Sequence, residues 1–310
     1  MNFLDNVISA ATQVTVLYLI VAVGFVCDKT KLFTEKTARA TVNLLLHVVT
    51  PCMLINSFIK IEMNEDTVKK FFISFAVATA THVIAIALNK FFFRNKEDSD
   101  NAVYKYASIY GNVGYMALPL AQAVLGDEGV FYCATGVVVF NIFCFTHGAA
   151  LMNKGKEKFN LKKLILNPGV IAVVIGLPIF LLNLEVPYII RQPLEMVGSL
   201  NTPIAMLIFG TYLANTDLKT MFTEKRIYLA SFLKLIVLPL LCIGLYYLCG
   251  IRGTLLTACI ITASVPSANN TFMFATKYDR DASVASKTVA LVSFISVLTM
   301  PVMIAITQLT

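Results

Sequence analysis

Apolar stretches of about 20 residues recur along the whole chain, separated by short polar segments, and this is the length that crosses a hydrocarbon layer about 30 Å thick as a helix. Because a helix satisfies its own backbone hydrogen bonds inside lipid, the pattern predicts an all-α polytopic membrane protein with ten transmembrane helices. The predicted spans are residues 6–26, 38–59, 70–93, 103–125, 130–152, 164–183, 190–214, 227–249, 253–276 and 284–307.

The composition supports this interpretation. Of the 310 residues, 57% are hydrophobic and only 14% are charged, whereas an ordinary soluble domain carries about 25% charged residues. The net charge of +7 raises the question of nucleic acid, but the basic residues lie in short loops and form no basic stripe with interleaved aromatic residues. We therefore expect a lipid bilayer around the protein and no nucleic-acid partner.

The distribution of basic residues predicts an orientation. Of the 25 Lys and Arg residues, 19 fall in or beside the loops after the odd-numbered spans and five fall on the opposite side. Cytoplasmic loops carry the excess of Lys and Arg, so both termini are expected outside the cytoplasm, in a multi-pass protein of the cell membrane. The first apolar stretch has no basic segment before it and is interpreted as a span, not a leader.

Two halves of the chain show weak internal similarity. VVTPCMLI (48–55) corresponds to LNTPIAMLI (200–208), and the turn GDEG (126–129) corresponds to YDRD (278–281). Five spans separate the copies, an odd number, so the second copy enters the membrane from the opposite side. We predict two inverted five-helix repeats, residues 1–152 and 164–310, joined by a cytoplasmic linker at 153–163.

The fourth and ninth spans contain helix-breaking residues at corresponding depths. Gly111, Gly114 and Pro119 interrupt the fourth, and Pro266 with the polar run after it interrupts the ninth. An interrupted helix offers unpaired N–H groups and a partial positive charge, which suit a carboxylate. The alternative is that Gly and Pro only allow close helix packing. The candidate substrate-binding residues are Asn112, Gly114, Tyr115, Pro119, Pro266, Asn269, Asn270 and Thr271, with Met116 and Phe272 as hydrophobic neighbours.

Three further residues are candidates for accessory roles. Thr50 and Thr202 precede the paired prolines, and these Thr-Pro pairs are either further breaks at the site or kinks in scaffold helices. Lys234 is an intramembrane charge that either neutralises a bound anion or extends its ammonium toward the cytoplasm.

Catalytic and metal-binding motifs are missing from the sequence. There is no HExxH, no GxGD aspartate pair and no GxSxG, and the three histidines lack metal spacing. We predict no enzyme, no metal site and no cofactor, and leave open whether sodium or a proton is a co-ion. Alternatives are a sodium-coupled symporter, a sodium/proton antiporter, a channel or an intramembrane enzyme; an antiporter generally needs a titratable carboxylate, which the predicted crossing segments lack.

Three segments, GNVGYMALPL (111–120), SVPSANNTFMFATKY (264–278) and LNPGVIAVVIGLP (166–178), resemble the auxin efflux carrier family. This family includes the plant PIN-FORMED auxin exporters and bacterial permeases for organic acids, and the resemblance extends over essentially the whole chain. The family is similar in fold to the bile acid:sodium symporters, which have ten spans in two inverted repeats.

The resemblance implies that the fourth and ninth spans cross near the midplane inside a transport domain of spans 3–5 and 8–10. Spans 1, 2, 6 and 7 would form a scaffold through which a homodimer assembles, and transport of a small organic anion, a carboxylate or auxin-like weak acid, would use an elevator-type movement. Asn112 and Pro119 match the family's crossover asparagine and proline. Thr271 stands where the plant carriers have the second crossover proline, so the substrate cannot be carried over.

Overall fold

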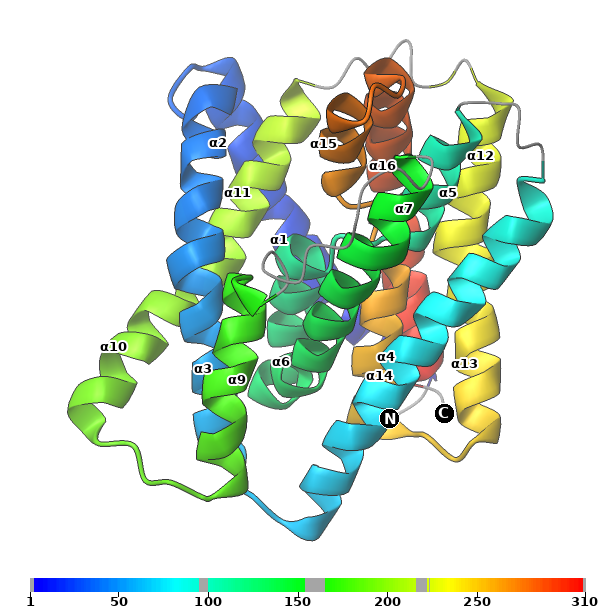
Figure 1. Cartoon of the computed structure of the whole chain (residues 1–310). Helices are drawn as coiled ribbons and strands as arrows, with labels where there is room; N and C mark the ends of the chain where they lie inside the picture. Colours follow the sequence, from blue (N-terminus) through cyan, green and yellow to red (C-terminus); the bar gives the residue numbers. More distant parts are fainter. Residues whose placement is uncertain (1–2, 95–99, 154–164, 216–221, 223, 309–310) are drawn as a thin grey trace.

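The computed structural model describes residues 3–94, 100–153, 165–215, 222 and 224–308 (Figure 1). Throughout these residues the regular structure is helical, and the β contacts amount to an isolated bridge between Gly111 and Ser267. The all-helical class predicted from the sequence is confirmed. The predicted linker, 153–163, lies outside the described residues except for Asn153.

Helices occupy every predicted span. In the first half they are α1 (Phe3–Lys29), α2 (Glu35–Leu44), η1 (Leu45–Val49), α3 (Thr50–Lys60), α4 (Glu65–Phe92), α5 (Asn101–Ile109), η2 (Val113–Ala117), α6 (Leu118–Phe143), η3 (Cys144–Gly148) and α7 (Ala149–Met152). In the second half they are α9 (Pro168–Leu181), α10 (Tyr188–Ser199), α11 (Asn201–Ala214), α12 (Lys225–Phe232), η4 (Leu233–Val237), α13 (Leu238–Leu248), α14 (Gly253–Ser264), α15 (Asn270–Lys277) and α16 (Ala282–Thr307).

Several helical stretches are long and apolar enough to cross a membrane. Among the described residues there are six of these, and Pro168–Leu181 and Gly253–Ser264 are shorter apolar helices. The longest, Val113–Met152, is divided at Gly126, where a φ of 66° and a ψ of −152° change the direction of the helix. The six stretches are Glu35–Lys60, Glu65–Phe92, Val113–Met152, Tyr188–Ala214, Lys225–Leu248 and Ala282–Thr307.

Proline accounts for three of the π-helical turns. The segments η1, η2 and η4 end just before Pro51, Pro119 and Pro239 respectively. A proline has no N–H to donate and its ring collides with the carbonyl four residues earlier, so the helix widens by one residue before it. The helix therefore continues through Thr50-Pro51 and is widened there, not broken.

Side-chain caps fix the starts of three helices. Asn64 accepts a hydrogen bond from the Thr67 amide at 2.9 Å at the start of α4, and Asp281 accepts one from the Val284 amide at 3.0 Å at the start of α16. Asn167 caps α9 by accepting from the amides of Gly169 and Val170. These residues satisfy backbone donors that the first helical turn leaves unpaired.

The helices pack in two sets of neighbours. One set joins α11 to both α1 and α2, and α3 to both α9 and α10. The other joins α6 to α4 and α14, and α16 to α12, α14 and α15. The sets meet where α6 touches α3 and α9, where α16 touches α1 and where η2 touches α11.

The connections between helices alternate between two ends of the molecule. In Figure 1, α1 begins and α16 ends toward the lower end, where the α3–α4, α9–α10 and α13–α14 connections also lie. The α1–α2 turn and the α15–α16 turn lie at the opposite end. This end, referred to below as the α2 end, contains Lys29, Lys31, Lys36 and Arg39.

Candidate functional site

The interruptions after α5 and after α14 are hydrogen-bonded to each other. The Asn112 amide donates to the Pro266 carbonyl at 2.7 Å, and the Ala268 amide donates to the Tyr110 carbonyl at 2.9 Å. Because the residues between helices lose their helical partners, this short antiparallel pairing satisfies backbone groups that burial would otherwise leave unpaired. Two segments about half a chain apart thus form one unit.

The sequence at the first interruption suits this close approach. A Cβ on Gly111 would lie 2.8 Å from Val265 Cγ2 and 2.9 Å from Lys234 Nζ, so any larger residue would force these side chains to move. On the other strand, the Ser267 hydroxyl donates to the Ala107 carbonyl at 2.7 Å, near the end of α5. Residues at both interruptions therefore stabilise the break rather than a continued helix.

A cavity of about 340 Å³ lies beside the paired interruptions. This volume falls within the usual range of small-molecule sites. Its wall combines residues of α2, of α11, of both interruptions and of α15 and α16. The lining residues are Glu35, Arg39, Asn112, Phe209, Tyr212, Leu213, Asn215, Asn269, Phe272, Ser286, Val289, Ala290 and Ser293.

Asn112 and Asn269 bring one carboxamide from each interruption to this cavity. Asn112 is only 7% exposed, and within the described part of the chain neither side-chain amide has a hydrogen-bond partner. The polar atoms of neither side chain are among the fully buried atoms without a partner, so both carboxamides are accessible from the cavity and can bond a ligand there. Each amide can donate two hydrogen bonds and accept through its oxygen.

Many backbone donors near the interruptions are already used. The Val113 amide donates to the Gly111 carbonyl at 2.9 Å, and the Thr271 amide donates to the Ala268 carbonyl at 2.9 Å. The Phe272 amide donates to the Asn269 carbonyl at 3.1 Å. These bonds use part of the backbone donors at the interruptions, and the side-chain amides of Asn112 and Asn269 are further donors that face the cavity.

The comparison with known families decides the class of protein. A model of the membrane transport protein family matches residues 9–304, nearly the whole chain. The chain belongs to this family. The resemblance to auxin efflux carriers that three short segments indicated is thereby confirmed.

Relatives in this membrane transport protein family are distant but mostly full-length. An uncharacterized transporter of Methanocaldococcus jannaschii is 23% identical over 296 residues, 92% of this chain and 94% of the relative. A putative malonate transporter of Rhizobium meliloti is 25% identical over 256 residues, 76% of each chain. The auxin efflux carrier component 1 of Arabidopsis thaliana is 27% identical over 122 residues, covering 38% of this chain and 20% of that protein.

The other predicted site residues in this membrane transport protein lie around the cavity but do not line it. Asn270 turns its amide nitrogen toward Cys144 Sγ at 3.7 Å. Thr271 is fully buried and its hydroxyl has no partner in the described chain. A Cβ on Gly114 would meet nothing within 4 Å. Tyr115 packs against the core, Pro119 lies in the first turn of α6, and Pro266 contributes the carbonyl that pairs with Asn112.

Lys234 lies behind the paired interruptions, not in the cavity. It is 2% exposed, and its ammonium donates to the Ala263 carbonyl at 3.2 Å, near the C-terminal end of α14. A cation there complements the partial negative charge of the helix end. Its ammonium also lies beside Gly111. The two roles considered from the sequence, anion neutralisation and extension toward the cytoplasm, stay predictions.

Thr50 and Thr202 also lie outside the cavity wall. The Thr50 hydroxyl accepts a hydrogen bond from the Asn201 side chain at 2.7 Å, which ties the first turn of α3 to the first turn of α11. Thr202 is half-buried beside it. The corresponding Thr-Pro segments of the two halves therefore meet through an interhelical hydrogen bond.

Sequence reasoning missed the two charged residues of the cavity, Glu35 and Arg39. From the sequence, Arg39 is one of the basic residues near a loop and Glu35 has no assigned role. Their spacing of four residues at the start of a helix was the signal, since such a pair lies on one helix face.

Proposed function

We propose that this membrane transport protein is a secondary transporter that binds a small organic anion in the cavity beside the paired interruptions. The observation that carries the proposal is the pair of unpartnered carboxamides, Asn112 and Asn269, that reach one cavity from two interrupted helices. Their amide groups donate to a carboxylate, and the helix ends behind them add partial positive charge.

The carboxylate class has support from the relatives and from the cavity. One relative is named a putative malonate transporter, and malonate is a small dicarboxylate. The cavity of about 340 Å³ combines amide and hydroxyl groups with the aromatic side chains of Phe209, Tyr212 and Phe272. A site of this kind accommodates an anion with an apolar body, including an auxin-like weak acid.

The proposed architecture is ten spans in two inverted repeats, residues 1–152 and 164–310, with the interrupted fourth and ninth spans crossing. The proposed scaffold contains spans 1, 2, 6 and 7, and the proposed transport domain contains spans 3–5 and 8–10. The two sets of packed helices described above support this division. An elevator-type movement of the second set along the first would carry the anion across the membrane.

The proposed orientation places the α2 end in the cytoplasm and both termini outside, in keeping with the excess of basic residues near the α2 end. We further propose assembly as a homodimer through the scaffold, as the family resemblance implies. Sodium and protons are the candidate co-ions; the buried, unpartnered hydroxyls of Ser264 and Thr271 are oxygen atoms of the type that sodium takes.

Uptake into proteoliposomes tests the proposed function. Radiolabelled malonate, propionate and indole-3-acetate are supplied in turn, with and without sodium and with and without a pH gradient. Saturable uptake that shows counterflow identifies a carrier, whereas flux that does not saturate identifies a channel. No flux of any of these carboxylates would contradict the proposal.

The Asn112→Ala variant links transport to this site. Loss of hydrogen bonds to a charged ligand should reduce transport by about tenfold or more without preventing membrane insertion. Asn43→Ala removes the same side chain from an exposed position of α2 outside the cavity and serves as the matched control. Full transport by Asn112→Ala would exclude this site.

A further inference from the structure

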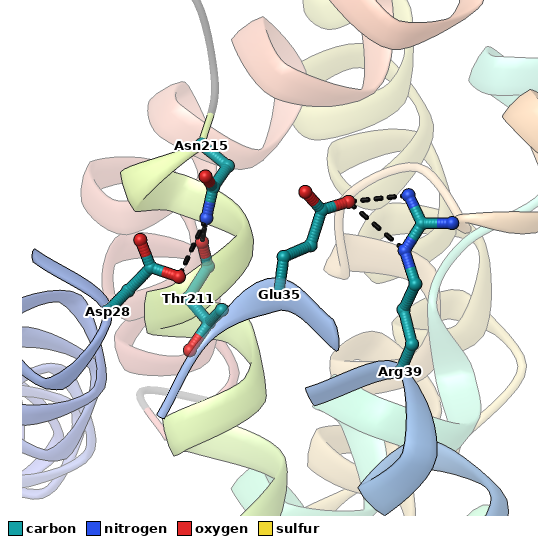
Figure 2. Close-up of polar contacts among 5 residues, drawn as sticks. All are labelled: Asp28, Glu35, Arg39, Thr211 and Asn215. Carbon is teal, nitrogen blue, oxygen red and sulfur yellow. Dashed lines mark hydrogen bonds and ion pairs between the residues drawn. The ribbon is translucent and has the colours of Figure 1, made fainter. Parts of the chain in front are cut away.

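Arg39 and Glu35 are the charged side chains among the residues that line the cavity. Arg39 Nη2 lies 2.5 Å and Nε lies 3.1 Å from the same oxygen, Oε1 of Glu35 (Figure 2). The side chains are 69% and 40% exposed respectively. An exposed pair four residues apart on one helix is weak, and Glu35 uses only one of its two oxygens, so an incoming carboxylate can replace it.

The wall that carries this ion pair is tied together at the α2 end. The Asn215 side chain donates to Asp28 at 2.9 Å and to the Thr211 carbonyl at 2.9 Å (Figure 2). Lys29 Nζ donates to the Ala214 carbonyl at 2.7 Å. These bonds join the end of α1 to the end of α11, and α2 packs against α11. Arg39 therefore faces the cavity from the packed set of helices that contains α1, α2 and α11.

The carboxamides of Asn112 and Asn269 face the same cavity from the other set. If the second set moves relative to the first, the anion stays with the asparagines and separates from Arg39. A cation on the static wall therefore contributes to binding only while the cavity is open toward the α2 end. Arg39 and the asparagines should differ in the side of the membrane from which they affect transport.

We propose that Arg39 is a side-specific binding residue that captures the substrate carboxylate at the α2 end, and that Glu35 occupies it as an internal competitor until the substrate arrives. This proposal rests on the proposed function and adds to it which residue supplies the positive charge and on which side. Arginine suits the role because its planar fork holds a carboxylate by two parallel hydrogen bonds.

Transport measured from each side tests this. Right-side-out and inverted membrane vesicles that contain the full chain are supplied with radiolabelled malonate, and the half-saturating concentration is measured from each side. Arg39→Gln should raise the half-saturating concentration by about tenfold or more on the side that exposes the α2 end, and by less than about twofold on the other side. Glu35→Gln should lower it on the same side, because the internal competitor is gone.

Lys36→Gln is the matched control, since Lys36 lies on the same helix, is exposed and does not line the cavity. It removes the same charge from the same end and should leave the half-saturating concentrations on both sides unchanged. An equal effect of Lys36→Gln and Arg39→Gln would mean that general surface charge acts, and would overturn the proposal. Arg39→Lys keeps the positive charge but lacks the planar fork of arginine. Its half-saturating concentration on the α2 side should lie between those of the wild type and Arg39→Gln.

The two proposals fail differently. If Asn112→Ala loses transport from both sides while Arg39→Gln transports normally or is impaired equally from both sides, the role of Arg39 is wrong and the site at the interruptions stands. If the wild-type protein gives no saturable malonate flux and none with propionate or indole-3-acetate, both proposals fall. If the Arg39→Gln protein inserts poorly, Arg39→Lys takes its place in the comparison. A half-saturating concentration equal to wild type on the α2 side would then contradict the role of the arginine fork in binding.

Discussion

Glycine allows close approach at two contacts with different results. One contact joins α1 to α11, and the other joins the two interruptions. At the first, Gly24 and Gly210 bring two helices so close that a Cβ on either would collide with the backbone of the other helix, at Leu207 and at Val21. At the second, Gly111 lets two broken segments pair, and a cavity lined by polar groups remains alongside. The first contact is a tight helix–helix seam, typical of small residues in membrane proteins.

This difference indicates that the two contacts have different roles in the protein. The α1–α11 seam has no room to change and suits a static support. The interruptions present side-chain amides without protein partners to a cavity, which is typical of a binding site. Four comparisons of variants test this contrast, in order of decreasing expected effect.

The largest effect is expected from Gly210→Ala. The new Cβ would overlap the Val21 carbonyl and lie 2.7 Å from the Phe25 amide nitrogen, so α1 must move away. Overpacking against backbone should cost about 3 kcal/mol and lower both the yield of folded protein and the melting temperature. Gly244→Ala in α13 meets nothing within 4 Å and is the matched control; it should be neutral or stabilise by up to about 1 kcal/mol. Equal melting temperatures for the two variants would show that the seam is loose.

Gly111→Ala should have the next largest effect. Its Cβ would press on Val265 and on the ammonium of Lys234. Because the lysine side chain is flexible and can move, the free energy of unfolding should fall by only about 1 to 2 kcal/mol. Gly114→Ala, three residues later and beside open space, is the control and should keep the wild-type melting temperature. If both variants melt alike, the close pairing of the interruptions is not what selects glycine at position 111.

Asn269→Ala and Asn270→Ala compare two adjacent carboxamides that point to different surroundings. Asn269 lines the cavity, whereas Asn270 contacts Cys144. Asn269→Ala should reduce the rate of carboxylate uptake by about tenfold, equivalent to about 1.4 kcal/mol, and Asn270→Ala should reduce it less. The reverse order would move the anion to the Cys144 side of α15.

The smallest effect is expected for Lys60→Gln. Lys60 Nζ lies 2.7 Å from Glu195 Oε1 and 3.2 Å from Asp127 Oδ2, and so links α3 to α10 and to the bend in α6. Because all three side chains are partly exposed, the loss should be about 0 to 1 kcal/mol and should shrink at high salt. A melting temperature that falls by as much as in Gly210→Ala would show that this ion cluster contributes as much to stability as the glycine seam.

The sequence predicted the helical class and the location of helices well because length and apolarity determine where a helix can cross lipid. The breaks near Gly111 and Pro266 were also predictable, since both residues act on the backbone directly. The membrane transport family followed from three short segments and is confirmed.

The position of individual side chains could not be predicted from the same pattern. Lys234 was equally compatible with facing an anion or facing water, because a helical position gives no direction until its neighbours are known. In the structure the Lys234 ammonium lies in the space beside Gly111. Arg39 was grouped with loop charges because the wall it completes comes from α11 and α16, which are distant in sequence. Similarly, adjacent asparagines at 269 and 270 differ only through the local turn before α15.

An experimental structure of the purified protein with the carboxylate that it transports best tests the central claim most directly. We expect density for the anion in the cavity, within hydrogen-bonding distance of the side chains of Asn112 and Asn269. Anion density elsewhere with that cavity unoccupied, or unbroken helices through residues 110–112 and 265–269, would contradict it.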